Sequence, residues 1–202
     1  DIRANQILLR AAIGGIGNDE VVEVTAASSL SADTDAGDDA AIQINSIGDL
    51  PVGLVDAGAG AVTLNSTGDI DSATDDDVAD VLGGQINLQA DVGGIGNDST
   101  LDVAAETELN ADTTADNANI QIDSIGDLPV GLVQAGAGDV TLDSTGAIDG
   151  VTDNNVADVR GSQINLLAAV GGIGNSTTLD VTATTSLSAN TDAGDDGDIR
   201  ID

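Results

Sequence analysis

The chain of 202 residues contains no cysteine, histidine, lysine, methionine or aromatic residue. Without cysteine and histidine it has no disulfide, no thiolate nucleophile, no imidazole base and no ordinary zinc site. The absence of lysine removes Schiff-base chemistry and the lysine of a phosphate-binding loop. Most familiar catalytic machinery is therefore excluded, and we predict that the chain is not an enzyme.

Positive charge is also scarce. Four arginines stand against 36 acidic residues, which gives a formal net charge of −32. Nucleic acids and anionic membrane surfaces carry the same sign, so we expect neither of them as a partner. No apolar run approaches the roughly 18 residues of a membrane-spanning helix, so we also predict no membrane insertion.

What the sequence does contain is repetition. The segment "SIGDLPVGLV" at 46–55 recurs letter for letter at 124–133, and "AGAG" at 57–60 recurs at 135–138. Both separations are 78 residues, and the two copies of "GGIGND" at 14–19 and 93–98 are 79 residues apart, so the super-repeat is 78–79 residues long. Self-similarity at a fixed period is the sequence signature of repeat architectures.

A shorter rhythm runs inside the super-repeat. Triplets that alternate apolar, polar and apolar residues start at Val22, Ile42, Val62 and Ile86, spaced by 20, 20 and 24 residues, and 15 more lead to Leu101. This alternation is typical of half-buried strands, and the Gly, Asp, Asn, Ser and Thr between the triplets favour turns. The pattern predicts an all-β, parallel β-solenoid with right-handed winding. We expect coils of about 20 residues, four in each super-repeat and about ten in all.

The repeat also sets the expected domain organisation. We predict a single solenoid segment over residues 1–202, cut from a longer repetitive chain. Residues 1–79 hold the end of one repeat and most of the next, 80–157 a full repeat, and 158–202 a partial repeat.

The chain resembles the repetitive body of filamentous-haemagglutinin-type exoproteins and autotransporter passengers. The likeness is carried by "GGIGN", "VTLNSTGDI" (62–70), "INLQADVGGIGN" (86–97) and "LDVTATTSLSA" (179–189), and it extends over essentially the whole chain. The resemblance implies a right-handed β-helix that serves as an adhesive or spacing fibre on a bacterial surface. It transfers no catalytic residue.

The motif "GGIGND" at 14–19 returns at 93–98, and as "GGIGNS" at 171–176. Its first copy matches the spacing of the glycine-rich calcium nonapeptide, which makes Asp19 and Asp98 candidate calcium ligands. The alternative is a sharp corner, for which glycine supplies positive φ or close backbone approach. We favour the corner, because calcium sites of this type need consecutive nonapeptides and no second one follows.

Acidic loops give a second set of candidate metal ligands. Asp71, Asp75 and Asp80 recur one repeat later; the later members are Asp149, Asp153 and Asp158. Carboxylate oxygens suit Ca²⁺, but a solvated, soluble face explains the same residues more simply. Paired carboxylates also raise the possibility of a β-helical polysaccharide lyase or hydrolase. We set that aside because the acids are spread along the repeat rather than gathered at one place.

These observations lead to an expected function. We expect a non-enzymatic structural or adhesive segment of a large extracellular bacterial fibre or adhesin, secreted to the cell surface. Its expected partners are neighbouring repeats or identical chains in a filament, and host or surface ligands bound through other domains. For this function we expect no cofactor. The alternative is a calcium-binding extracellular solenoid, whose Asp-rich turns bind Ca²⁺ ions that stabilise the fold.

Overall fold

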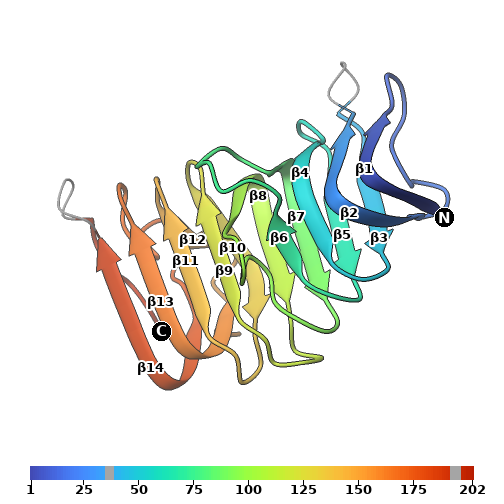
Figure 1. Ribbon diagram of the computed structural model, residues 1–202. Coiled ribbons are helices and arrows are strands. Elements are labelled where there is room, and N and C mark those ends of the chain that lie inside the picture. Colours follow the sequence, from blue (N-terminus) through green and yellow to red (C-terminus); the bar gives the residue numbers. More distant parts are fainter. Residues whose placement is uncertain (35–38, 192–196) are drawn as a thin grey trace.

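The computed structural model describes residues 1–34, 39–191 and 197–202, and Figure 1 shows them as a rod of stacked strands. Fourteen strands form one wound sheet, and their pairings are parallel. The strands are β1 (Ile2–Arg10), β2 (Val22–Asp33), β3 (Ile42–Ser46), β4 (Leu50–Asp56), β5 (Val62–Ser66), β6 (Ile70–Ser72), β7 (Val81–Ala90), β8 (Leu101–Asp112), β9 (Ile120–Ser124), β10 (Leu128–Gln134), β11 (Val140–Ser144), β12 (Ile148–Gly150), β13 (Val159–Ala168) and β14 (Val181–Thr191). The prediction of an all-β parallel β-solenoid is confirmed. The rod has about 8 turns of about 22 residues, so the expected number of about ten coils of about 20 residues is too high. In the described part of the chain no helix is long and apolar enough to span a membrane.

Two rows of apolar residues run along the rod, with one member of each row in every coil. Row A is Leu50, Ile70, Ile95, Ile120, Val140, Ile164 and Leu187, each paired in register with the next. Row B starts with Ile16, Ile42, Val62, Ile86 and Leu109. Leu109 pairs with Val130, and the row continues from the same strand, β10, two residues earlier, with Leu128, Ile148, Ile173 and Ile199. The chain passes through rows A and B alternately. Each coil therefore encloses a core to which each row contributes one residue.

The super-repeat contains a half-integral number of turns. Between Ile42 in row B and its counterpart Ile120 in row A, the chain passes through the rows seven times, which is three and a half coils. The prediction of four coils per repeat is therefore wrong by half a coil. The 15-residue interval from Ile86 to Leu101 is less than one turn, because Leu101 pairs with Ile122 on the other side of the rod. Equivalent residues of successive repeats thus lie on opposite sides.

The core is built from small and branched aliphatic side chains. In β3 and β5 buried residues alternate strictly with half-buried ones, as expected for strands with one face on a core. The buried apolar residues are Ala, Val, Ile and Leu, and most members of both rows have no exposed surface. Burying one valine, leucine or isoleucine side chain contributes about 1.5–3 kcal/mol, and parallel coils about 4.8 Å apart keep each one in contact with its counterparts.

Long strands bend around the corners of the rod and so join its sides. In β8 the first part, Leu101–Val103, pairs with β9, whereas the last part, Leu109–Asp112, pairs with β10. The corresponding bend in β7 is marked by a register shift between Gly83 and Gln85. The bends of successive coils lie above one another, which aligns the outward side chains near each corner.

The stacked core predicts a large and local cost for truncating Ile95. Its side chain is fully buried between Ile70 and Ile120, so the change Ile95→Ala leaves a cavity that the neighbouring coils cannot close. We expect a loss of about 2–5 kcal/mol in the free energy of unfolding, measured by urea denaturation followed by circular dichroism. The matched control is Val92→Ala in the adjoining turn, where the side chain is 62% exposed and we expect a change below about 0.5 kcal/mol. Equal losses in the two variants would contradict a core organised in rows.

Candidate functional site: glycine corners and acidic columns

The glycines of the three "GGIGN" motifs form corners of the coil. The last glycine of each copy, Gly17, Gly96 and Gly174, has positive φ (78°, 65° and 65°). A Cβ at Gly96 would run into the carbonyl oxygen of Gln121 in the next coil, and the other two copies make the same approach to the coil beside them. Positive φ and close backbone approach are the two situations that require glycine, so the corner interpretation is confirmed for these positions.

The three motif copies do not stack on one another. Ile16 of the first copy pairs with Ile42, and Ile95 of the second pairs with Ile70 and Ile120. Because consecutive copies are three and a half coils apart, they also lie in opposite rows. Calcium sites of the nonapeptide type are built jointly by adjacent turns, and this motif does not supply adjacent turns.

The structure places the candidate ligands of these motifs in different settings. Asp19 is exposed at its corner. Asp98 lies next to Asp71, because the backbone N–H of Asp98 donates to Asp71 Oδ1 at 3.1 Å. In the next repeat Asp149 Oδ1 accepts the same bond from the N–H of Ser176 at 3.0 Å. Asp71 and Asp149 therefore tie each corner to the coil below it.

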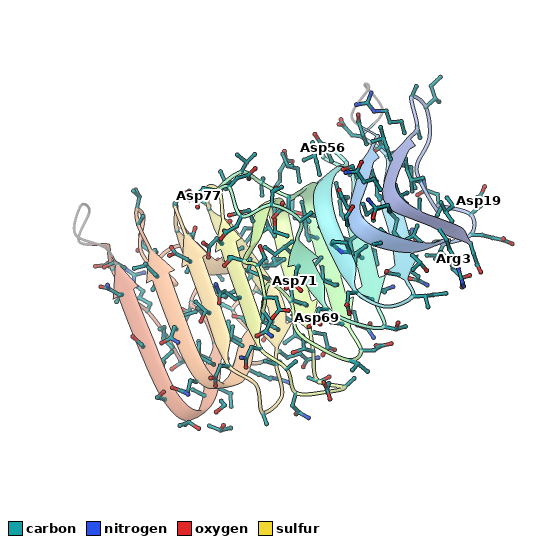
Figure 2. All side chains as sticks on the ribbon, viewed as in Figure 1. Arg3, Asp19, Asp56, Asp69, Asp71 and Asp77 are labelled. Atoms are coloured by element: carbon teal, nitrogen blue, oxygen red, sulfur yellow. The ribbon has the colours of Figure 1, made fainter. Side chains whose placement is uncertain are left out.

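Figure 2 shows Asp71 beside Asp69 on the same side of the rod. Burial, together with the charges of Asp69 and Asp98, raises the pKa of Asp71 above its ordinary value, against the lowering effect of the hydrogen bond from Asp98. The neighbouring Asp69 Oδ1 accepts a hydrogen bond from the N–H of Gly94 at 2.6 Å. Both carboxylates thus act as acceptors for corner backbone.

The candidates Asp80 and Asp158 are buried and hydrogen-bonded to backbone. Asp80 Oδ2 accepts from the N–H of Asp102 at 3.0 Å, and Asp80 Oδ1 accepts from the Ser72 hydroxyl at 2.9 Å. Asp158 Oδ2 accepts from the N–H of Asp180 at 3.0 Å. These side chains join consecutive coils at the point where a loop returns to the sheet.

The remaining candidates lie in the loops that lead to those buried acids. Asp75 is exposed between β6 and β7, and Asp153 is exposed between β12 and β13. Among residues 1–34, 39–191 and 197–202, no group of three or more acidic side chains is arranged to hold a metal ion. The structure thus pairs Asp71 with Asp98, and it does not gather the eight candidates into one site.

The structure reveals an acidic column that the sequence patterns did not single out. Asp102 pairs in register with Asp123, and Asp123 pairs with Asp143. Asp80 continues this column in the preceding coil, where its N–H donates to the carbonyl oxygen of Asp102 at 2.8 Å. Four consecutive coils therefore place a carboxylate at the same point. The sequence signals two of these four positions. Asp123 in "IQIDS" and Asp143 in "VTLDS" stand where the earlier repeat has asparagine, in "IQINS" and "VTLNS".

The equivalent column of the earlier repeat has different chemistry. There Glu23 pairs with Asn45, and Asn45 pairs with Asn65. The Asn65 side-chain amide donates to Asn45 Oδ1 at 2.9 Å, so stacked amides satisfy each other. Stacked carboxylates have acceptors only, and like charges at this separation repel.

Three members of the acidic column, Asp80, Asp102 and Asp123, have raised pKa values. Burial, followed by the charges of Asp143, Asp102, Asp77 and Asp75, raises the pKa of Asp123 to about 6. Burial likewise raises the pKa of Asp80 to about 6, with Asp102 and Asp76 adding to the effect and hydrogen bonds opposing it. Asp77, one of the loop acids that faces the column, is labelled in Figure 2. At neutral pH the native rod therefore holds ionised carboxylates in surroundings that favour their protonated form.

Comparison of the chain with protein-family models, with curated proteins and with solved structures gives no match.

These pKa values predict that mild acid stabilises the rod. Because the native pKa of Asp123 lies above its ordinary value of 3.8, the native state binds more protons than the unfolded state between about pH 4 and pH 6. The free energy of unfolding therefore falls as the pH rises through this window, and we expect a higher melting temperature at pH 4.5 than at pH 7. Thermal unfolding followed by circular dichroism at constant ionic strength measures the melting temperature at the two pH values.

The two columns supply matched variants for this prediction. Asp123→Asn with Asp143→Asn copies the earlier repeat, so it should raise the melting temperature at pH 7 and flatten its pH dependence. Asn45→Asp with Asn65→Asp should lower the melting temperature at pH 7 and steepen the dependence. An unchanged pH profile in both variants would show that the effect comes from the overall charge and not from the column.

Proposed function

We propose that the chain is a rod segment of a large, non-enzymatic fibre or adhesin on a bacterial surface. The observation that carries this proposal is the continuity of rows A and B through successive repeats, with strands in register from coil to coil. Such a solenoid is stiff along its axis and lengthens by a fixed step for each added repeat. The likeness of its motifs to filamentous-haemagglutinin-type exoproteins and autotransporter passengers supports the extracellular placement.

The charge distribution fits the same role. Outward carboxylates give the rod its net charge of −32, so separate rods repel one another while each core stays dry. Contacts that join the fibre then form only along the axis, between neighbouring repeats or between identical chains placed end to end. Adhesion to a host or surface ligand is assigned to other domains of the fibre.

Insertion of a repeat tests the proposal. A second copy of residues 80–157 placed after residue 157 keeps the order of half-turns, so it should add about 17 Å to the rod at about 4.8 Å per coil. The cross-section should not change. Small-angle X-ray scattering gives both the longest dimension and the cross-sectional radius, and a thicker particle of unchanged length would overturn the proposal.

The control for this insertion disturbs the phase. The same inserted copy without residues 140–147 lacks one half-turn, so every later strand meets the opposite row. We expect this variant to melt at a lower temperature than the complete insertion. A rod whose repeats tolerated any phase would show no difference.

The alternative function, a calcium-stabilised solenoid, is favoured by one observation. Asp180 is only 5% exposed, and its Oδ2 has no hydrogen-bond partner among the described residues. It occupies the position of Asp102 one repeat later, so it belongs to the same kind of acidic column. A divalent cation would supply the positive charge that such stacked carboxylates lack.

A melting experiment separates the two functions. The rod proposal predicts equal melting temperatures in CaCl₂ and in NaCl of matched ionic strength, since both only screen charge. The calcium alternative predicts an additional stabilisation of about 2.7 kcal/mol when Ca²⁺ is at 100 times its dissociation constant. A calcium-specific rise in melting temperature that EDTA reverses would favour the alternative. It would show that the stability of the rod depends on bound calcium.

A further inference from the structure

Two equivalent grooves lie on the rod, one in each repeat. The first, the Pro51 groove, has a volume of about 350 Å³ and includes Ile47, Asp49 and Pro51. The second, the Pro129 groove, has a volume of about 610 Å³ and includes the counterparts Ile125, Asp127 and Pro129. Volumes of this size are those of ligand-binding sites. Because the repeat spans three and a half coils, the two grooves open on opposite sides of the rod.

The grooves coincide with the segment that is identical in both repeats. Residues 46–55 and 124–133 have the same ten letters, whereas flanking positions change, as in Asn45 to Asp123. Identity within the core needs no further cause, but Ile47 and Ile125 are 44% and 41% exposed. An exposed isoleucine retained at the same groove position in both repeats has no role in the core.

The Pro129 groove runs along the rod axis. Its wall passes through successive coils at Asp56, Leu82 and Ala104, which pair in register, and then reaches the turn at Ile125. Pro129 pairs with Asp149 in the coil beyond. Five coils at about 4.8 Å give a length near 20 Å, which accommodates about six residues of extended polypeptide at about 3.3 Å each.

The groove has an apolar floor and an acidic rim. Small and apolar side chains such as Gly83, Ala104 and Ala105 leave the floor open around Ile125. Its acidic residues are Asp56, Glu106, Asp127 and Asp149, and no arginine is among the residues that line either groove in the described part of the chain. Asp56, which is labelled in Figure 2, lies in the first of the five coils that the Pro129 groove crosses.

The charge of the groove identifies the kind of occupant. A second copy of this chain carries the same net charge of −32 and has only four cationic side chains, so it cannot complement the rim. We propose that the Pro129 groove binds an extended, basic polypeptide segment of a different protein, in which lysine or arginine alternates with aliphatic residues. The Pro51 groove spans three coils and has two acidic residues, Asp49 and Asp71, so it takes a shorter segment of the same kind. The cationic side chains pair with the rim acids, and the aliphatic ones cover Ile47 or Ile125. This proposal does not depend on the length of the rod.

The test uses fluorescein-labelled hexapeptides in a library that alternates Lys or Arg with Ala, Val or Leu. Anisotropy of the fluorescein label measures the binding. At 150 mM NaCl we expect saturable binding of library members, with the tighter site in the Pro129 groove and a weaker site in the shorter Pro51 groove, and no binding of the counterparts that carry Glu in place of the cations.

Three variants locate the binding. Asp49→Asn, Asp71→Asn, Glu106→Gln, Asp127→Asn and Asp149→Asn together remove five groove charges, and we expect at least about tenfold weaker binding. The matched control removes five exposed acids elsewhere, by Asp19→Asn, Glu20→Gln, Asp75→Asn, Asp76→Asn and Asp153→Asn. Binding to the control should change less than about twofold. Ile47→Ser with Ile125→Ser keeps the charge and should also weaken binding, because the aliphatic contact is lost.

Each contrary result overturns the proposal. If no library member binds better than its Glu counterpart, the grooves do not take basic segments. If the matched control loses as much affinity as the groove variant, the attraction belongs to the whole rod. If the isoleucine variant binds normally, the groove is not the contact surface. Self-association that the isoleucine change abolishes, measured by sedimentation, would identify a second copy as the occupant.

Discussion

The in-register stacking of parallel coils is the constraint on which the rest of this structure depends. Each side chain lies directly against the one at the same position in the coils above and below, so chemistry is repeated along the axis. Where the repeated residue is Ile, Val or Leu, the result is a continuous dry row. Where it is aspartate, as at Asp102, Asp123 and Asp143, the same geometry concentrates charge. Stability and electrostatic strain therefore have one geometric source.

The sequence was sufficient to predict the fold class, because triplets such as those at Ile42 and Val62 carry the alternation of a strand and recur at the length of a coil. It was insufficient for the number of turns in a repeat. Ile95 lies in a glycine-rich corner and forms only isolated β-bridges to its neighbours. The sequence around it therefore has no alternating strand pattern that would predict its place in row A. A residue that occupies a core position without a strand around it is visible only when the neighbouring coils are known.

The candidate site shows the same division. The glycine corners followed from local backbone chemistry, since Gly17 and Gly96 adopt the positive φ that glycine tolerates best. The acidic column did not, because the contact between Asp102 and Asp123 depends on a register set 21 residues apart. Taken alone, each aspartate matches an ordinary outward position of a half-buried strand. Only the pairing of the strands shows that these aspartates occupy the same position in consecutive coils.

The half-integral repeat has a consequence for how such a chain changes in evolution. Tandem repeats gain and lose copies by unequal recombination, and here the unit exchanged turns everything distal to it by half a revolution. Removing or adding one copy reverses the direction in which all later surfaces face, while two copies restore it. Rod length and facing direction are thus inherited together, and the parity of the copy number becomes a structural trait.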